Sequence, residues 1–166
     1  MEVFRNIKDF VNYEIPNLGN VRTKKTGKIL CGGNDGKGYL KVNLWKDNKK
    51  HPQSIHRLVA KAFLDNPDNK SCVDHKNGVR NDNRETNLRF ATFQENAQNM
   101  GISSRNTSGV KGISFNKKSN KWIARIMIDG ISVFLGYFED IDDAKNARIQ
   151  KANQVFGIFT NDIEKL

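Results

Sequence analysis

CVDHKNGVRNDNRETNLRFATFQENAQN, residues 72–99, is the stretch of sequence that decides the fold of the central part of the chain. Two short apolar runs, Cys72–Asp74 and Leu88–Ala91, flank a loop rich in Asn, Asp, Gly and Arg, a pattern that predicts two strands joined by a polar loop. A helix is expected to begin after Thr92, because Thr92 and Glu95 have the spacing of a capping box. The predicted order is therefore strand, loop, strand, helix.

Asp74 and His75 stand side by side where the first strand enters the loop, so both side chains can converge on one substrate. Histidine offers a base with an unperturbed pKa of about 6.5. Asp74 offers an oxygen ligand, and Asn96 on the following helix would face back and offer a second one. Two oxygen ligands suit Mg²⁺ and phosphate oxygens rather than zinc. A base, a cation and a rigid scaffold are the parts that phosphodiester hydrolysis needs.

The simpler interpretation of the same residues is a surface turn, which Asp74 and His75 cap and whose Asn residues are ordinary turn formers. Three features favour a site: the strand-loop-strand-helix frame, the downstream Asn87 and Asn96, and the basic character of the whole chain.

Positive charge is in large excess, with 28 Lys and Arg against 18 Asp and Glu in 166 residues, a net charge of +10. Such an excess usually signals a polyanionic partner, most often nucleic acid, although a merely basic protein is the alternative. Residues 1–70 hold 14 basic and 7 acidic side chains and residues 106–134 hold 5 and 1, whereas residues 71–105 hold 5 and 4. The excess therefore lies on particular segments, as a binding surface requires.

Several classes of protein are disfavoured. No apolar run approaches the length of about 20 residues that a membrane span needs, and MEVFRNIKDF at the N-terminus is too charged for a signal peptide. We expect a protein with no membrane partner that stays in the cytoplasm or nucleoid of its host cell. Cys31 and Cys72 form no CxxC pair, so we expect free thiols and no zinc. No segment suggests a dimer helix, and we expect a monomer.

Residues 13–46 alternate short apolar runs with Gly and Asn turns, which predicts small antiparallel hairpins through Val21, Ile29 and Leu30 and through Leu40–Leu44. Period two puts Lys41 and Asn43 opposite the apolar residues of the latter strand. We expect the hairpins to form a basic ribbon that contacts DNA; a Lys-rich edge that only prevents aggregation is the alternative. The candidate contacts are Arg22, Lys24, Lys25, Lys37 and Lys41.

The rest of the chain predicts a helix, a linker and a small α+β module. HRLVAKAFLDNP is typical of a helix that begins near Ser54 or Ile55 and ends before Asn66-Pro67, and His51 ahead of it is expected in a solvated loop. GISSRNTSG, residues 101–109, has the composition of a linker. Three strands follow, two of them joined at Asp129-Gly130, and then an amphipathic helix with apolar positions at Ala144, Ala147, Ile149, Ala152 and Phe156.

The stretch VDHKNGVRNDNRETNLRFATFQENAQN resembles the HNH homing endonuclease family, in the variant whose last motif position is Asn. IHRLVAKAF and YEIPNLGNVRTKKTGKIL resemble the nuclease-associated segment common in phage and intron-encoded members of mobile elements. NTSGVKGISFNKKSNKWIARIMIDGISVFLGYFEDIDDAKNARIQKANQVFG resembles the DNA-binding domain of plant ethylene-response factors. These matches predict an N-terminal β segment at 1–53, an HNH core at 54–100, the linker at 101–109 and an ethylene-response-factor-type domain at 110–160.

The resemblance implies an α+β fold in which a ββα-metal nuclease core follows small antiparallel hairpins and precedes a three-stranded sheet with one helix. By position, His75 matches the general base and Asp74 a metal ligand. Asn87 matches the residue that braces the hairpin loop, and Asn96 matches the second metal ligand, where many relatives have His. The implied cofactor is one divalent cation, Mg²⁺ in the first place, with Mn²⁺ as the alternative.

The implied partner is double-stranded DNA. Period two along KWIARIMI puts Lys121, Ile123, Arg125 and Met127 on one face of the C-terminal sheet, and Trp122, Ala124, Ile126 and Ile128 against the helix. For His56, packing or a phosphate contact is expected rather than catalysis. The candidate contacts outside the N-terminal hairpins are His56, Arg57, Arg80, Lys111, Ser114, Asn116, Lys118, Lys121 and Arg125.

The sequence is compatible with three functions. The first is a site-directed, metal-dependent DNA endonuclease of a mobile element, for which nicking is the default action of a monomer with one site. The alternative is a DNA-binding regulator that keeps the scaffold without activity, which would have no need of all four residues Asp74, His75, Asn87 and Asn96. An RNA-binding protein is the third and weakest, because the sequence shows no aromatic residues spaced for base stacking on a sheet.

Overall fold

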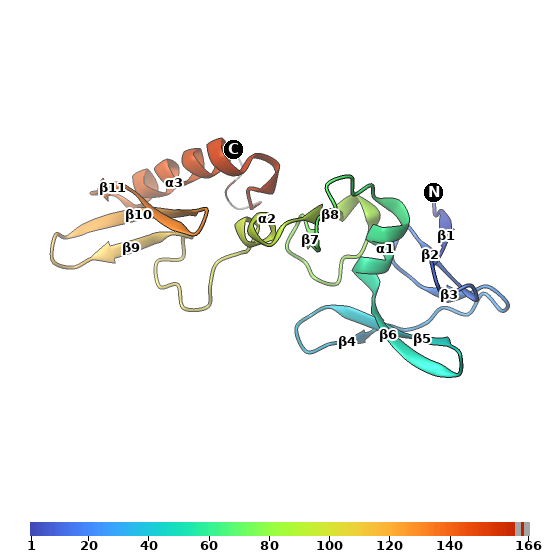
Figure 1. The fold of residues 1–166 in the computed structure, drawn as a ribbon. Coiled ribbons are helices and arrows are strands. Elements are labelled where there is room, and N and C mark those ends of the chain that lie inside the picture. Colours follow the sequence, from blue (N-terminus) through green and yellow to red (C-terminus); the bar gives the residue numbers. More distant parts are fainter. Residues whose placement is uncertain (162–163, 165–166) are drawn as a thin grey trace. The chain divides into compact units, whose positions relative to one another are not determined.

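A computed structural model describes residues 1–161 and 164 of the chain, which divides into two compact units, Met1–Phe93 and Gln94–Leu166 (Figure 1). The elements up to the first unit's end are β1 (Phe4–Asn6), β2 (Tyr13–Pro16), β3 (Arg22–Thr23), β4 (Gly33–Asn34), β5 (Leu40–Lys46), β6 (Lys49–Ser54), α1 (Ile55–Phe63), β7 (Cys72–His75), the 3₁₀ turn η1 (Glu85–Asn87) and β8 (Leu88–Ala91). The later elements are α2 (Phe93–Gln98), β9 (Ile113–Asn116), β10 (Lys121–Ile128), β11 (Ile131–Phe138), α3 (Ile141–Phe156) and the 3₁₀ turn η2 (Gly157–Phe159). This mixture confirms the predicted α+β class.

The first unit packs small antiparallel sheets around helix α1. The sheets have the strand orders β1-β2-β3, β4-β5-β6 and β7-β8. Their shared core contains Ile15, Leu44, Val59 and Leu88, each no more than 1% exposed. Helix α1 ends at Phe63, three residues ahead of the predicted Asn66-Pro67 stop, and its C-cap residue Leu64 has an extended backbone. The apolar stripe of α1 therefore joins all three sheets into one body.

The N-terminal hairpins differ from the prediction in two places. Residues 49–53 form strand β6 instead of a loop, paired with β5 across a turn in which Asp47 and Asn48 have φ angles of 50° and 56°. Asp and Asn tolerate this left-handed conformation, which matches the twist of a two-residue hairpin. Conversely, the strand expected around Ile29 is reduced to a single bridge with Arg22, and Ile29 is 57% exposed. Strand β5 has the predicted alternation.

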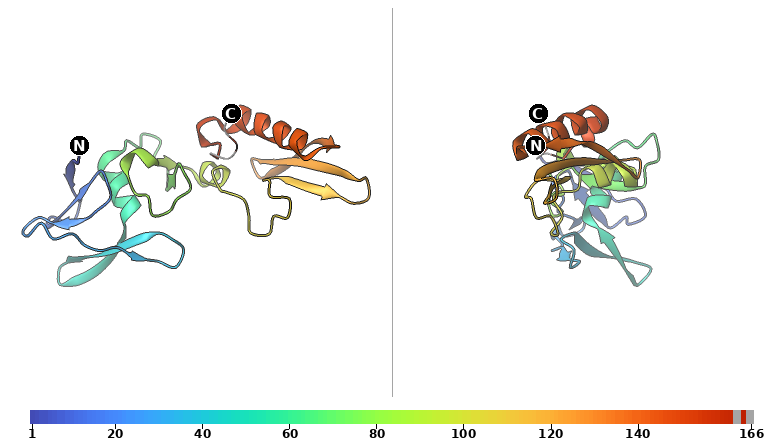
Figure 2. Two further views of the ribbon diagram at one scale, coloured as in Figure 1. Left: turned by 180° about the vertical axis from the view of Figure 1, so that it is seen from behind. Right: turned by 90° about the vertical axis from the view of Figure 1, so that its left-hand side faces the viewer.

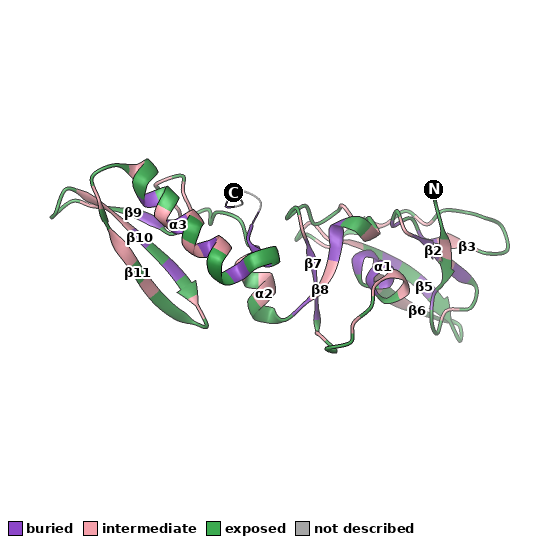
Figure 3. Ribbon diagram, turned by 90° about the horizontal axis from the view of Figure 1, so that it is seen from above, coloured by how far each residue is buried: buried purple, intermediate pink, exposed green. Residues whose placement is uncertain are grey.

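The second unit is a three-stranded antiparallel sheet, in the order β11-β10-β9, with α3 along one face (Figures 1 and 2). Ala124 and Ile126 point to the helix side and pack with buried residues of α3, whose buried and exposed positions alternate along the helix (Figure 3). Asp129 and Gly130 form the turn between β10 and β11, with φ angles of 51° and 78°. These features confirm the predicted facing of KWIARIMI and the predicted hairpin.

The predicted linker at residues 101–109 falls inside the second unit, and the division of the chain comes earlier, between Phe93 and Gln94. The assignment of residue ranges to functional domains stays a prediction. Among residues 1–161 and 164, no helix has the length and apolar character needed to cross a membrane.

A β-bulge in β11 changes which residues share a face of the second unit's sheet. Ala124 pairs with Gly136 but Arg125 pairs with Phe134, so Leu135 is the extra residue and packs into the helix-side core. Phe134 and Tyr137 consequently both lie on the open face, 48% and 55% exposed, with ring centroids 5.1 Å apart. Regular alternation would have separated them. The sheet therefore has an exposed aromatic pair, contrary to the expectation that no aromatic residues are suitably spaced on a sheet.

The two faces of β10 predict a contrast between neighbouring substitutions. Ile126 is 2% exposed and Met127 is 58% exposed. Ile126→Ala should lower the free energy of unfolding by about 2–5 kcal/mol through lost burial and a cavity. Met127→Ala should change it by about 0.5 kcal/mol or less. Urea unfolding followed by the fluorescence of Trp122, which lies on the same strand and packs on the helix side of the sheet, compares them; equal midpoints would contradict the packing.

Candidate functional site

Asp74 and His75 lie at the end of β7, where Asp74 pairs with Arg89 and His75 with Leu88 of β8. Every residue of β7 is buried, and Asp74 and His75 are only 5% and 4% exposed. Polar groups this deeply buried need partners inside the protein. The interpretation of these two residues as the cap of a solvated surface turn is therefore wrong.

The His75 ring is held by Asn83, a residue of the loop between β7 and β8. Nε2 of His75 lies 3.2 Å from Oδ1 of Asn83, and Asn83 is 4% exposed. Because a carboxamide oxygen only accepts, this contact favours the tautomer with the proton on Nε2 and the lone pair on Nδ1. Burial lowers the pKa of His75, against the opposing effects of Asn83 and Asp74. At neutral pH the ring is thus uncharged, which is the form that a general base requires.

A second histidine and a tyrosine complete a cluster of rings around His75. The ring centroids of His56 and Tyr39 lie 5.2 Å and 5.8 Å from that of His75, and 5.0 Å from each other. Burial, followed by the charge effects of His75 and Arg57, lowers the pKa of His56 to about 4. His56 is 7% exposed and its ring packs against Tyr39 and His75, which favours packing; the phosphate contact predicted for it stays untested.

Asp74 forms a two-pronged ion pair with Arg89. Nε and Nη2 of Arg89 both lie 2.7 Å from Oδ2 of Asp74, and both side chains are largely buried. This geometry fixes the orientation of the carboxylate. Arg89 was not singled out from the sequence, since only the β7-β8 register sets it opposite Asp74.

Asn87 makes the contacts of a loop brace. Its Nδ2 donates to the carbonyl oxygen of Asp82 at 2.8 Å, and its Oδ1 accepts from the backbone N–H of Asn77 at 3.1 Å. The backbone N–H of Lys76 donates to the carbonyl oxygen of Asn87 at 2.8 Å. The side chain therefore ties both ends of the loop and its middle together; the functional role assigned to it stays a prediction.

The four predicted site residues fall in two units. The first unit brings Asp74, His75 and Asn87 together, whereas Asn96 lies half-buried on α2 in the second unit. Across residues 1–161 and 164, no group of three or more His, Cys, Asp and Glu side chains is arranged to hold a metal ion.

Most basic candidates of the first unit are available to a partner. Arg22 is less exposed than the others: its Nε lies 2.6 Å from Oε1 of Glu14, and its guanidinium stacks 3.4 Å from the centre of the Phe4 ring. Its role as a DNA contact stays a prediction. The exposed candidates are Lys24, Lys25, Lys37, Lys41, Arg57 and Arg80.

Two surface hollows of the first unit are lined by these residues. One of about 410 Å³ is lined by Arg57 together with Lys61 and Lys70, which the sequence analysis did not select. Another of about 620 Å³ is lined by Lys24 and Lys25. Helix spacing could have pointed to Lys61, four residues after Arg57 on α1. Basic hollows of this size can receive a phosphate backbone.

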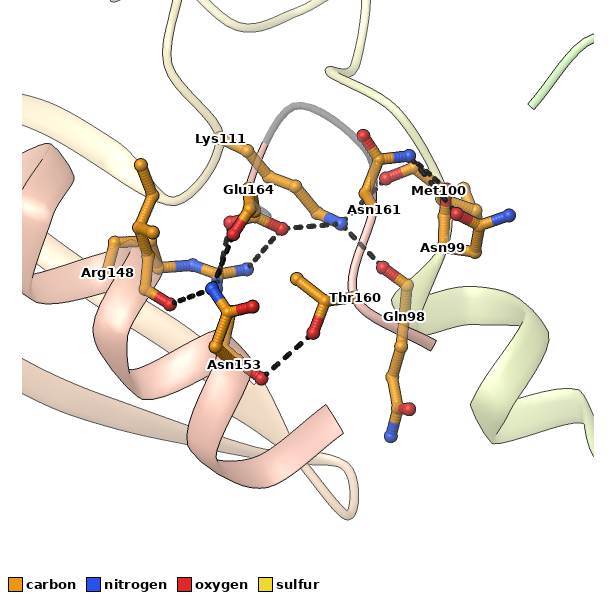
Figure 4. Close-up of polar contacts among 11 residues, drawn as sticks. Gln98, Asn99, Met100, Lys111, Arg148, Asn153, Thr160, Asn161 and Glu164 are labelled. Atoms are coloured by element: carbon orange, nitrogen blue, oxygen red, sulfur yellow. Dashed lines mark hydrogen bonds and ion pairs between the residues drawn. The ribbon is translucent and has the colours of Figure 1, made fainter. Parts of the chain in front are cut away.

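The second unit keeps most of its candidates on the surface but turns Lys111 inward. Nζ of Lys111 donates to the carbonyl oxygens of Gln98 and Met100, at 2.9 Å and 2.6 Å, and lies 3.5 Å from Oε2 of Glu164 (Figure 4). Burial lowers the pKa of its ammonium. Lys111 therefore caps the carbonyls at the end of α2 and is corrected as a DNA contact.

The other candidates of this unit lie on or beside the sheet. Lys121 forms an exposed ion pair with Glu139 at 2.8 Å. Oδ1 of Asn116 accepts the backbone N–H of Lys118 at 2.9 Å and so shapes the turn between β9 and β10. Ser114, Lys118 and Arg125 are exposed.

Known proteins resemble this chain over most of its length. A family model described as HNH endonuclease matches residues 54–98, and one described as the NUMOD4 motif matches residues 2–45. The DNA endonuclease I-HmuI of Bacillus phage SP01 is 35% identical over 130 residues, which cover 77% of this chain and 74% of that protein. The chain belongs to the HNH endonuclease family. The resemblance of residues 72–99 to that family is thereby confirmed.

Two further comparisons place this HNH endonuclease family member among its relatives. The solved structure described as "DNA binding and cleavage by the HNH homing endonuclease I-HmuI" matches with a TM-score of 0.57 and 31% identity, over 80% of this chain and 76% of that one. Uncharacterized HNH endonuclease L245 of Acanthamoeba polyphaga mimivirus is 37% identical over 135 residues, 81% of this chain. The chain spans only 37% of the length of L245, and 24% of that of the related L247.

His56 predicts a pH dependence of stability. Its pKa is about 4 in the folded protein, and about 6.5 is expected in the unfolded chain. Between these values the unfolded chain binds more protons, so the free energy of unfolding should rise with pH, by up to about 1.4 kcal/mol per pH unit. His56→Gln should flatten this slope while leaving the same-signed contribution of His75. Urea unfolding at a series of pH values measures both slopes; equal slopes would contradict the burial of a neutral His56.

Proposed function

We propose that the protein is a DNA endonuclease that hydrolyses phosphodiester bonds at chosen sites, as homing endonucleases of mobile elements do. The observation that carries the proposal is the neutral, buried His75 ring beside Asp74, held by Asn83 at the end of β7. An imidazole in a surface loop would form hydrogen bonds with water and would need no buried partner. Membership of the HNH endonuclease family agrees with this proposal.

In this proposal, His75 takes a proton from the water that attacks the phosphorus, and the ring is neutral before the step because burial disfavours its charged form. Asn87 braces the loop that follows His75 through its contacts with Asn77 and Asp82. Arg89 holds the Asp74 carboxylate in a fixed orientation. Asn87 and Arg89 act before any bond changes, by fixing the base and the carboxylate in place.

One divalent cation is proposed, with Asp74 as its ligand in the first unit; Asn96 as the second ligand stays a prediction from the sequence. A carboxylate and an amide oxygen form a sparse set of hard donors, which fits Mg²⁺ or Mn²⁺ with further positions for phosphate oxygens and water. The set does not fit zinc, which prefers His and Cys ligands. When bound, the cation would stabilise the negative charge that develops on the phosphate and on the leaving oxygen.

Double-stranded DNA is the proposed substrate, held by basic surfaces of both units. In the first unit these are the exposed Lys24, Lys25, Lys37, Lys41, Arg57 and Arg80. In the second unit we infer a DNA-binding module of the ethylene-response-factor type at residues 110–160, supported by its three-stranded sheet, its single helix and the cationic residues of its open face. The exposed Phe134 and Tyr137 add apolar contact area beside Arg125. We propose that a monomer nicks one strand at each encounter.

The test of the base is plasmid nicking by His75→Ala. Cleavage should fall by about 10²–10⁴-fold, which is the usual contribution of a positioned general base. His51→Ala is the matched control. His51 lies on β6, where its ring packs against that of Phe10, so its substitution should leave cleavage unchanged. EDTA should stop the wild type and added Mg²⁺ should restore it.

Each other outcome has a defined meaning. Equal cleavage by wild type and His75→Ala would remove His75 from the mechanism. Undiminished activity of the wild type in EDTA would remove the cation. Tight DNA binding by a wild type that never cuts would favour the catalytically silent regulator.

The open face of the second unit's sheet predicts a salt-dependent contribution to binding. Arg125→Ala should weaken DNA binding and reduce the slope of log affinity against log salt by about 0.9, if Arg125 makes one phosphate contact. Lys145→Ala, which removes an exposed charge from α3 on the opposite face, is the control of equal charge. Fluorescence anisotropy with a labelled duplex at several salt concentrations measures the affinity of both variants. Equal salt slopes for the two would show that the lost net charge, and not the position of Arg125, explains the effect.

A further inference from the structure

We infer that Asn83 is a positioning residue for His75, and that the N-terminal turn at Gly19 holds Asn83 in place. The inference rests on the proposed function, since it gives the general base its orientation. It also assigns the N-terminal segment a second task besides the DNA contact proposed for it. The residues that carry it all belong to the first unit, and both His75 and Asn83 are buried.

The first step is the hydrogen bond between the two side chains. Asn83 offers Oδ1 to Nε2 of His75 at 3.2 Å, and both residues are about 4% exposed. In a neutral imidazole, the hydrogen bond at one nitrogen decides which nitrogen keeps the lone pair. Asn83 thus favours the tautomer with its lone pair on Nδ1. Without this acceptor, the buried Nε2–H would lose a partner and the other tautomer would gain population.

The second step is the contact between Asn83 and Gly19, in the turn that follows β2. Gly19 has a φ of +91°, and a Cβ placed on it would lie 2.8 Å from Cβ of Asn83 and 3.2 Å from its carbonyl oxygen. The turn and the loop are tied again nearby, because the backbone N–H of Glu85 donates to the carbonyl oxygen of Asn17 at 2.8 Å. Only glycine allows the turn to approach the backbone of Asn83 this closely.

The third step is that the turn at Gly19 holds a part of the β7-β8 loop that the side chain of Asn87 does not contact. Asn87 ties Asn77 and Asp82, whereas Asn83 and Glu85 are held from the N-terminal side by the turn. A shift of the turn would therefore move Asn83 and, through its side chain, the His75 ring. Misplacement of a reacting group by about 1 Å can cost about 10²-fold in rate.

Gly19→Ala with Gly36→Ala as its control separates this effect from simple backbone strain. Gly36 has a φ of +81°, and a Cβ added to it would meet nothing within 4 Å, so both alanines face a similar left-handed strain and only one meets Asn83. Single-turnover cleavage should fall by about 10–10²-fold in Gly19→Ala and in Asn83→Ala, with DNA affinity within about two-fold of wild type. The double variant should be no slower than Asn83→Ala, because both changes act through one residue. Gly36→Ala should cut like wild type.

The His75 tautomer is the readout that does not depend on cleavage. In ¹⁵N-histidine-labelled protein, NMR should report the Nε2–H tautomer of His75 in wild type, Gly36→Ala and Asn83→Asp, which keeps an acceptor. Asn83→Ala should show a mixture of tautomers, and Gly19→Ala should shift toward it. These spectra test positioning even if wild type proves unable to cut DNA, in which case the proposed function fails and the positioning stands.

The inference is overturned if Asn83→Ala keeps both the Nε2–H tautomer and the wild-type rate. It is equally overturned if folded Gly19→Ala matches Gly36→Ala in both readouts. Should Gly19→Ala fail to fold, the comparison of Asn83→Ala with Asn83→Asp still decides whether Asn83 positions His75: loss of the tautomer in Ala and its retention in Asp supports the role, and identical spectra remove it.

Discussion

Burial of two adjacent polar residues at one strand end is the constraint on which the first unit depends. A carboxylate and an imidazole that leave water must find partners inside the protein, because an unpaired buried charge costs several kcal/mol. Arg89 supplies the partner of Asp74 across the β7-β8 pair, and Asn83 supplies that of His75 from the loop. The loop, the β7-β8 hairpin and helix α1 are therefore specified together. The loop and the hairpin supply the partners of His75 and Asp74, and α1 supplies the His56 ring that lies beside His75.

The same constraint appears in the second unit with different residues. Arg148 lies on the buried side of α3, and its Nη1 is 2.9 Å from Oε1 of Glu164, with both side chains 4% exposed. Lys111 joins this cluster from the end of α2, and Figure 4 shows how the three side chains converge. Breaking one member of such a cluster would leave a buried charge without compensation. The segment after α3 is thereby anchored to the sheet-and-helix module, whose open face stays available for binding.

These two arrangements give the units different tasks. In the first unit, buried polar residues hold the side chains of His75 and Asp74 in fixed orientations, and basic residues line hollows on the surface. The second buries its internal charges against each other and exposes Arg125 beside an aromatic pair. We propose that the first unit supplies the chemistry and that the second unit supplies part of the affinity for DNA.

Much of the fold was determined by the sequence alone, because its signals are local. Alternation and turn residues predicted β7, β8 and the facing of β10, and helical periodicity with a proline stop predicted α1. The Asp74-His75 pair was also visible in sequence, and so was Asn87. Tertiary structure decided the partners. Asn83, Tyr39 and His56 reach His75 only because the backbone brings loop, hairpin and helix together, and Gly19 meets Asn83 for the same reason. Arg22 and Lys111 turned inward because acceptors distant in sequence lay within reach, and the β11 bulge placed Phe134 and Tyr137 on one face. Periodicity encodes which face a residue takes within its own element; it carries no information on which atoms of another element will lie opposite.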